Sequence, residues 1–515
     1  MNELFWTVQL DGQPPLTGSA AADGPVHICC DAPAGVIRSV TARLERPLEN
    51  DECAFFNGYQ SWTWCRETGP KDRQWGVDHI PKTLMDRYAF DRYGDYHFAA
   101  YPHRAGCFHG FSYGYFRKGR RYWLFASLDE RPGYTIFSYD AAAGVLTLTR
   151  DCAGVHHPGG PLAAFDLYFA QGGEAAVFDG WFAAMHCRPR TTARLAGYTS
   201  WYNRYEAITE QTVLSDLAGC RGLLQPGDLF QIDDGWEPCV GDWLEPDAAK
   251  FPGGMKELSD QVHASGFLSG LWLAPFACAE RSALYRQHPD WLLQQNGRPW
   301  KAGGNWGNFY ALDIDLPAVQ AHLEQVFDRV LNQWGYDLVK LDFLYAAAPF
   351  GTAGESRAGR MIRAMELLRR WCGDKLILGC GVPLMPAFGL VDYCRIGCDV
   401  SLTWDDVWYM HGFHRERIST KHSIDNTVYR RQLGGRAFGN DPDVFFLREH
   451  NCKLTAEQKQ LLARINARYG QVLLTSDDPS AYTPQMLEQY NTLRRQWEAP
   501  AAPNRAAAAK QPAAT

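Results

Sequence analysis

The sequence has no long basic segment, no long apolar run and no paired cysteine motif. Its 58 acidic and 51 basic side chains leave a net charge of -7. Binding to nucleic acid or to an anionic membrane surface requires clustered lysine and arginine, so neither is expected as a partner. No apolar run reaches the roughly 18 residues of a membrane span, and the first residues lack a secretory pattern. We therefore expect a soluble, cytoplasmic protein without a membrane partner.

The cysteines indicate a reducing compartment. There are fifteen, an odd number, and most are scattered in apolar surroundings such as those of Cys380 and Cys394. A free thiol in such a place packs as a small hydrophobic group. Cys29 and Cys30 are adjacent, and the Cys-x-x-Cys spacing of structural zinc sites does not occur. We expect no metal and no cofactor.

Aromatic residues are plentiful, with 18 tryptophans and 24 tyrosines. Sugar rings present C–H faces that stack on aromatic side chains, but large hydrophobic cores use the same residues. Composition therefore leaves a sugar site and a large core as equal interpretations.

The pattern of the chain changes near residue 190. Residues 1–173 contain short alternating runs separated by Gly, Pro and Asp, which predicts an N-terminal antiparallel β-sandwich. Residues 174–190 predict a connecting helix and linker, because Val177, Phe178 and Trp181 fall on one helical stripe.

Residues 191–497 alternate between strand and helix patterns, which predicts an α/β fold of the (β/α)8 TIM-barrel type. Residues 402–431 read as a long insertion, and the Ala- and Pro-rich residues 498–515 as a disordered tail. The helical runs are 317–334, 359–371, 455–469 and 484–497. The eight expected strands are 195–200, 229–232, 267–273, 338–341, 376–380, 393–397, 444–447 and 472–475.

Aspartates end three of these strands. Asp342 follows the fourth strand, Asp399 the sixth, and Asp233 with Asp234 the second. A single aspartate there is as typical of a turn as of a catalytic group. Four unpaired acids converging at one end of a barrel are costly unless they have a function. Retaining glycosidases need two such carboxyl groups about 5 Å apart, one as nucleophile and one as acid/base.

Other residue types at the strand ends suit a sugar site. Lys340 alternates with Asp342, so both point into the barrel, where a buried ammonium requires an anionic or hydroxyl partner. The pair Asp233-Asp234 suits bidentate hydrogen bonds from vicinal hydroxyls, with Trp236 as a stacking face. Trp272 ends the third strand, where it either floors a sugar subsite or belongs to the core.

An ordered set of motifs resembles one known family. Asp233-Asp234-Gly235-Trp236 is followed by His288-Pro289-Asp290-Trp291, by 312–317 (Leu-Asp-Ile-Asp-Leu-Pro) and by Lys340-Leu341-Asp342. This order is similar to that of the α-galactosidases of glycoside hydrolase family 36, in the melibiase clan. The resemblance covers about 195–472 and extends weakly to 57–62 (Asn-Gly-Tyr-Gln-Ser-Trp).

The resemblance implies a role for each matching residue. Asp342 would be the nucleophile and Asp399 the acid/base, and Asp233, Asp234, Trp272 and Lys340 would bind the first sugar. Cys380 resembles a family cysteine near the 2-hydroxyl, although Val382-Pro383-Leu384 departs from the pattern that follows it. Segment 440–443 (Asn-Asp-Pro-Asp) resembles one in related clan members, without a defined role here.

The function implied is a retaining α-glycosidase that hydrolyses terminal α-galactosides through a covalent glycosyl-aspartate intermediate. Its partner would be a glycoside or oligosaccharide substrate. Whether the chain also forms a homo-oligomer stays open. The sequence departs from the family pattern at two places that bear on galactose specificity. Residues 272–276 read Trp-Leu-Ala-Pro-Phe where the family usually has Trp-Phe-Glu-Pro-Glu, and Asn308 lies near the position where the family usually has an arginine. A transglycosylase of the raffinose-synthase type and a non-catalytic sugar-binding protein are the alternatives.

Overall fold

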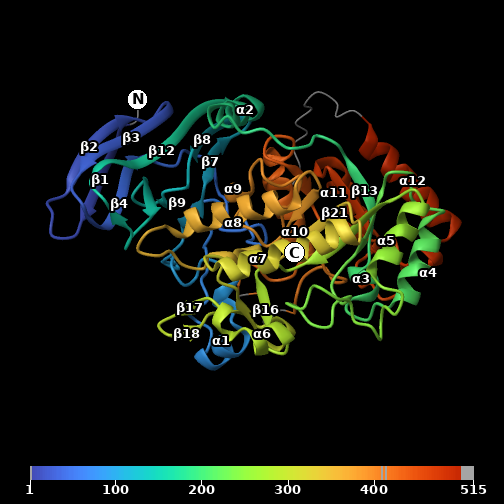
Figure 1. Cartoon of the computed structure of the whole chain (residues 1–515). Helices are drawn as coiled ribbons and strands as arrows, with labels where there is room; N and C mark the ends of the chain where they lie inside the picture. Colours follow the sequence, from blue (N-terminus) through green and yellow to red (C-terminus); the bar gives the residue numbers. More distant parts are fainter. Residues whose placement is uncertain (1–2, 408–409, 412–413, 500–515) are drawn as a thin grey trace.

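The computed structural model describes residues 3–407, 410–411 and 414–499. The chain forms a β-rich N-terminal region, followed by an α/β region whose helices surround a parallel sheet (Figure 1). No helix among these residues is long and apolar enough to cross a membrane. The tail expected to be disordered lies, from residue 500 onward, outside the described residues.

The N-terminal region contains two antiparallel sheets. One has the order β2-β1-β4-β10-β9-β6, with β11 (His156–His157) paired to β4. Its other strands are β1 (Glu3–Leu10), β2 (Leu16–Ala21), β4 (Gly35–Glu45), β6 (Cys107–Phe111), β9 (Tyr134–Asp140) and β10 (Val145–Asp151). The other sheet has the order β3-β12-β8-β7-β5. Its strands are β3 (Gly24–Ala32), β5 (Cys53–Phe56), β7 (Tyr113–Lys118), β8 (Arg121–Ser127) and β12 (Gly160–Gly173).

Both sheets contribute to one hydrophobic core. Leu44 and Leu148 from the first sheet and Phe125 and Leu167 from the second are almost fully buried in it. Along β10 every second residue is buried, the pattern of a strand with one face on a core. The alternation read from the sequence therefore predicts these strands well.

Helix α2 (Glu174–Ala184) links the two regions, where the sequence predicts a connecting helix. Its residues Val177, Phe178, Trp181 and Phe182 are buried. The Trp181 indole donates a hydrogen bond to the Ser127 carbonyl at 2.8 Å, and its ring lies 5.9 Å from that of Phe388. The helix thus packs against both regions at once.

The α/β region is built on a curled parallel sheet of nine strands, in the order β24-β23-β22-β21-β15-β14-β13-β26-β25. The two strands at the ends of this order, β24 and β25, are separated in the sequence only by Pro442 and Asp443. The seventh expected strand, 444–447, is therefore wrong in its bounds, because Asp443 has a φ of 73° and breaks the strand into two short pieces. The strands are β13 (Leu195–Thr199), β14 (Leu229–Ile232), β15 (Leu268–Leu273), β21 (Leu338–Leu341), β22 (Leu376–Gly379), β23 (Tyr393–Arg395), β24 (Gly439–Asp441), β25 (Val444–Phe445) and β26 (Val472–Thr475).

The helices of this region follow the apolar periodicity of the sequence. The sequence predicts one α-helix over 317–334. In the structure the α-helical part, α7, ends at Asp328, and a π-helical turn, η4 (Arg329–Gln333), follows it. The expected insertion 402–431 contains α10, and two small sheets, β16-β20-β19 and β17-β18, fill the segment between β15 and α7. The principal helices are α4 (Glu210–Cys220), α5 (Met255–Ala264), α7 (Pro317–Asp328), α8 (Arg357–Cys372), α10 (Thr420–Tyr429), α11 (Ala456–Tyr469) and α12 (Pro484–Glu498).

Arg430, directly after α10, joins the two regions. Its side chain is fully buried. It donates hydrogen bonds to four oxygens: the Asn57 side-chain oxygen and the carbonyls of Gln60, Ser61 and Ile396. Three of these acceptors belong to the N-terminal region, so one guanidinium fixes segment 57–61 against the parallel sheet.

Replacing Arg430 with methionine should lower the free energy of unfolding by at least about 3 kcal/mol, because buried oxygens lose their donors. Chemical denaturation followed by tryptophan fluorescence measures this loss. The matched control is Arg38→Met on β4, where an exposed ion pair with Asp11 contributes about 1 kcal/mol or less. Equal stability of the two variants would contradict the role of Arg430.

Candidate active site

The expected acidic residues gather at the carboxyl ends of the parallel strands. Asp342 follows β21, Asp233 and Asp234 follow β14, and Asp399 lies four residues beyond the end of β23. In a parallel sheet these ends share one edge, where ligands of α/β folds bind. Asp233, Asp234 and Asp342 are buried, and about a third of the Asp399 side chain reaches solvent.

Asp342 is held on both carboxyl oxygens. The Trp272 indole donates to its Oδ2 at 3.1 Å, and the Phe343 backbone N–H donates to its Oδ1 at 2.9 Å. Phe343 has a φ of 54°, a left-handed conformation that is strained for a bulky residue. This turn brings the backbone N–H onto the carboxyl group and fixes its orientation.

Lys340 and Asp233 form a buried ion pair, with 2.8 Å between Nζ and Oδ2. The same Asp233 oxygen accepts hydrogen bonds from Gln231 at 2.7 Å and from Thr199 at 3.3 Å. Burial opposes the charge of Lys340, but the carboxylates of Asp233 and Asp342 outweigh it and hold the pKa of Lys340 well above its usual value. Asp233 thus supplies the anionic partner that a buried ammonium requires.

Asp234 differs chemically from Asp233. Burial, followed by the charge of Glu237, raises the pKa of Asp234 far above its usual value, and the two side chains share a hydrogen bond. The Trp306 indole donates to Asp234 Oδ2 at 2.9 Å. The sequence suggests two adjacent carboxylates as acceptors; burial beside Glu237 favours the protonated form of Asp234, which can also donate a hydrogen bond.

Asp399 is paired with the buried Arg395 at 2.6 Å. Arg395 also contacts Asp443 at 2.9 Å and Asp441 at 3.5 Å, so three carboxyl groups surround one guanidinium. Although a third of its side chain is exposed, desolvation by the surrounding residues raises the pKa of Asp399 to about 7; Arg395 opposes this shift, whereas the charges of Asp443 and Asp342 add to it. The group therefore titrates near neutral pH, as a proton donor and acceptor must.

Cys380 lies under a residue of the N-terminal region. The Trp62 indole donates to its sulfur at 3.2 Å, and the Trp62 ring packs edge-on against Phe343 at 5.0 Å. Burial, followed by the charge of Asp342, raises the pKa of the Cys380 thiol, so it stays protonated. The segment that carries Trp62 thus reaches the strand-end site.

The two expected tryptophans support the site more than they line it. Trp236 was expected to offer a stacking face, but it is fully buried, packs against Trp243 and Trp334, and donates to the Trp272 carbonyl. Trp272 is 2 % exposed, and its indole holds Asp342. Trp306 is partly exposed, with its ring 4.8 Å from that of Phe343.

Several residues of the site have no role in the sequence-based prediction. Asn308, near the expected arginine, instead donates a hydrogen bond to Glu280 at 3.0 Å. Arg395, four residues before Asp399, could have been inferred from the need of clustered acids for a counter-charge. Glu237 and Trp306 gave no comparable signal. In the described part of the chain, no three His, Cys, Asp or Glu side chains are grouped to hold a metal ion.

Comparison with known proteins relates the region around this site to one family. The Melibiase family model matches residues 200–358. Alpha-galactosidase 1 of Pediococcus pentosaceus is 32% identical over 157 residues, which is 28% of this chain and 21% of that protein. Alpha-galactosidase of Escherichia coli is 29% identical over 153 residues, again 28% and 21%. The matched segment thus spans about a fifth of the length of these curated relatives.

Solved structures match nearly the whole chain. TtGalA, an α-galactosidase from Thermus thermophilus solved with p-nitrophenyl α-D-galactopyranoside, has a TM-score of 0.75 and 28% identity, covering 95% of this chain and 93% of that one. The GH36 α-galactosidase AgaA from Geobacillus stearothermophilus shares the fold, with a TM-score of 0.59 at 14% identity, covering 96% and 74%. In sequence over residues 200–358, and in fold over nearly its whole length, the chain is therefore similar to the α-galactosidases of the melibiase family.

Proposed function

We propose that this protein is a retaining α-galactosidase, with Asp342 as nucleophile and Asp399 as acid/base. The observation that carries the proposal is the contrast between the two groups. Asp342 has both oxygens oriented by N–H donors, whereas Asp399 titrates at about pH 7. Two carboxyl groups with divergent environments are the arrangement that retaining glycosidases use.

In the first step, Asp342 attacks the anomeric carbon of a bound α-galactoside. The bond from that carbon to the leaving oxygen breaks as the new carbon–oxygen bond to Asp342 forms. Protonated Asp399 gives its proton to the leaving oxygen, so the aglycone departs as a neutral alcohol. The Trp272 N–H holds Asp342 in a fixed orientation, which lowers the cost of reaching the reactive geometry.

In the second step, Asp399, now ionised, removes a proton from a water molecule. The resulting hydroxide attacks the anomeric carbon, releases Asp342 and restores the starting protonation states. Arg395 stabilises Asp399 while it is ionised. We expect the two carboxyl groups to be about 5 Å apart, the spacing that a covalent intermediate requires.

Sugar recognition is assigned to the charges around Asp342. Asp233, Lys340 and Asp234 offer an acceptor, a donor and a protonated carboxyl group for the hydroxyls of the first subsite. Trp272 acts on the sugar site by orienting Asp342 through its indole N–H. Cys380 is close enough to Asp342 and Lys340 for both charges to act on its thiol. TtGalA was also solved with stachyose, which supports a galactosyl oligosaccharide as the class of substrate.

We infer that β24 and β25 together act as the seventh strand of a closed (β/α)8 barrel, and that the two N-terminal sheets form a β-sandwich. The domains would be 1–173, a connector at 174–190, and 191–497. All fifteen cysteines are unpaired, which supports a reducing, cytoplasmic location.

Asp342→Asn should reduce turnover of aryl α-galactosides by several orders of magnitude, because the amide cannot form the glycosyl ester. The fold should persist, because the asparagine side chain still offers one oxygen that can accept a hydrogen bond from Trp272 or Phe343. Stopped assays with p-nitrophenyl α-galactoside measure the loss, and circular dichroism checks folding. Retention of more than about a tenth of the activity would exclude Asp342 as nucleophile.

The pH dependence should follow Asp399. Its protonated form is required in the first step, so kcat/KM should fall with rising pH above about 7, tenfold per unit once the group is ionised. In Asp399→Ala this alkaline limb should vanish for an activated aryl galactoside, and azide should restore turnover by forming a galactosyl azide. An unchanged alkaline limb in the variant would assign the titration to another group.

Substrate preference tests the sugar pocket. A site whose buried polar groups bond one hydroxyl rejects the epimer that misplaces it, by up to roughly 10⁴-fold. We therefore expect p-nitrophenyl α-galactoside to have a far higher kcat/KM than the α-glucoside. Similar values for both epimers would refute galactose specificity while leaving the retaining mechanism in place.

A further inference from the structure

A segment of the N-terminal region lies against the loop that carries Trp306. The segment contains α1 (Lys82–Tyr88) and η1 (Phe90–Arg92), and the loop runs from β19 (Lys301–Gly303) to η3 (Asn305–Gly307). In Figure 1, α1 lies beside the small sheets β16-β20-β19 and β17-β18. Lys301 Nζ donates to the backbone carbonyls of Asp86 and Arg87 at 3.0 and 3.1 Å. The ammonium group thus caps the last turn of α1 and ties the loop to the N-terminal region.

Tyr93 holds the loop directly before Trp306. Its hydroxyl accepts a hydrogen bond from the Gly304 backbone N–H at 2.9 Å and donates one to the Asn305 side-chain oxygen at 2.5 Å. Desolvation raises the pKa of the partly buried Tyr93 to about 12, so the hydroxyl keeps the proton that it donates. Gly304 fits closely, because a Cβ atom there would lie 2.8 Å from the Tyr88 carbonyl oxygen. The loop can therefore approach the N-terminal segment this closely only with glycine at position 304.

The backbone of Trp306 needs this support. It has a φ of 53° and a ψ of 25°, a left-handed conformation that is strained for a bulky side chain. In this conformation the indole N–H reaches Asp234 Oδ2 at 2.9 Å, and the ring lies 4.8 Å from that of Phe343. A strained backbone persists only where its surroundings determine it. The grip of Tyr93 on the preceding residue, Asn305, therefore bears on where the indole points.

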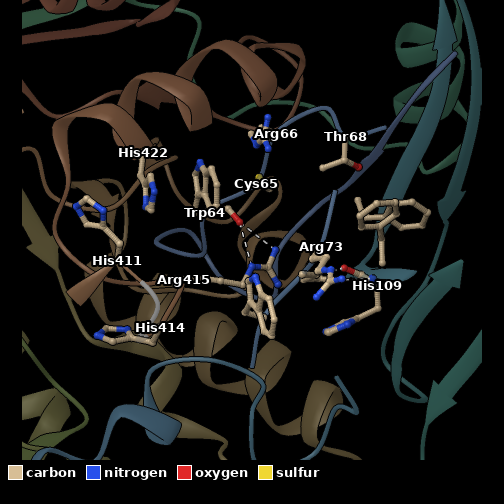
Figure 2. A pocket seen from close by; sticks show the side chains of 14 residues that line it. Trp64, Cys65, Arg66, Thr68, Arg73, His109, His411, His414, Arg415 and His422 are labelled. Carbon is tan, nitrogen blue, oxygen red and sulfur yellow. Dashed lines mark hydrogen bonds between the residues drawn. The ribbon is translucent and has the colours of Figure 1, made fainter. Parts of the chain in front are cut away.

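Tyr93 is itself fixed by contacts outside the loop. The Gln60 side chain donates to the Tyr93 carbonyl at 3.0 Å, and the Tyr93 ring lies 5.9 Å from that of His414. The next residue, Arg415, donates two hydrogen bonds to the Trp64 carbonyl, as Figure 2 shows. Tyr93 is thus attached both to segment 57–62 and to the segment that leads into α10. It offers the loop a hydroxyl in a defined position.

We propose that Tyr93 is a positioning residue for the first sugar subsite, because its hydroxyl fixes the loop that holds the Trp306 indole on Asp234. Tyr93 acts on the loop, the loop places Trp306, and Trp306 orients Asp234. The inference rests on the proposed function in one respect, that Asp234 binds a sugar hydroxyl. The chain of contacts from Tyr93 to Asp234 is independent of the substrate.

Tyr93→Phe removes the hydroxyl and keeps the ring. A contact to a sugar hydroxyl that substrate and transition state share affects KM more than kcat, so KM for p-nitrophenyl α-galactoside should rise about three- to tenfold, with kcat changed less than about twofold. Partial unfolding would instead lower kcat and leave KM as it is. Tyr139→Phe is the matched control, because the Tyr139 hydroxyl donates to the Arg46 carbonyl at 2.8 Å within the N-terminal sheets. An unchanged KM in Tyr93→Phe, or the same change in the control, would overturn the proposal.

A double-mutant cycle shows whether Tyr93 acts through Trp306. Trp306→Phe keeps an aromatic ring but removes the indole N–H, and it should raise KM at least as much as Tyr93→Phe does. In the double variant, KM should stay within about twofold of the Trp306→Phe value, because the hydroxyl then has no indole hydrogen bond to support. Increases in KM that multiply in the double variant would assign Tyr93 another route of action and refute the inference.

A measurement without turnover separates this inference from the proposed function. In fluorine NMR of the full chain labelled with 5-fluorotryptophan, the resonance that is missing from Trp306→Phe belongs to Trp306. This resonance should shift in Tyr93→Phe and keep its wild-type position in Tyr139→Phe. A wild-type protein that cleaves no α-galactoside would refute the proposed function and leave this result in place. A Trp306 resonance at its wild-type position in Tyr93→Phe would overturn the positioning role.

Discussion

Two buried cations hold the carboxyl ends of the parallel strands together. Lys340 lies on β21 and Arg395 on β23, with β22 between them, and together they face five carboxyl groups: Asp233, Asp342, Asp399, Asp441 and Asp443. Two like charges at 4 Å repel by about 4 kcal/mol at an effective dielectric constant of 20. Five ionised acids around two cations would be unstable, so the cluster keeps a proton. Because the pKa of Asp399 is raised to about 7, Asp399 is the group that exchanges this proton most easily.

Asp234 and Glu237 show the same constraint in a simpler form. The structure records no ion pair for either residue in the described part of the chain, and both are buried. Two such acids cannot both ionise, so one proton stays between them. The hydrogen bond from Trp306 then orients Asp234, which stands beside Asp233, the partner of Lys340. Adjacent aspartates in the sequence therefore offer a hydroxyl-rich ligand two different kinds of contact.

The sequence predicts the strands and the strand-end acids well, because both depend on local patterns. Asp342 and Asp233 follow short apolar runs, and parallel strands bring such ends to one edge whatever the loops do. The partners of these acids depend on long-range contacts. Nothing near Trp306 in the sequence indicates that its indole bonds Asp234, 72 residues away.

Backbone conformation is a second feature that local patterns do not reveal. The apolar run predicts a seventh strand at 444–447, whereas the left-handed conformation of Asp443, which splits the strand, accompanies contacts of its carboxyl group with Arg395 and Tyr202. The burial of Trp236 depends on packing instead. Its position after two acids suggests exposure, but Trp243, which follows closely in the chain, and Trp334, from a distant segment, enclose it.

The hydrogen bond from Trp62 to Cys380 has a consequence for how such proteins can be assembled and can evolve. A ring from the N-terminal region completes the surroundings of a thiol beside the strand-end acids, and Arg430 fixes the segment that carries it. The β-rich region is therefore no detachable module. Exchanging it for that of a relative would transplant part of the surroundings of the strand-end acids, so the two regions must change together, and recombination between relatives should succeed only where segment 57–62 travels with its parallel sheet.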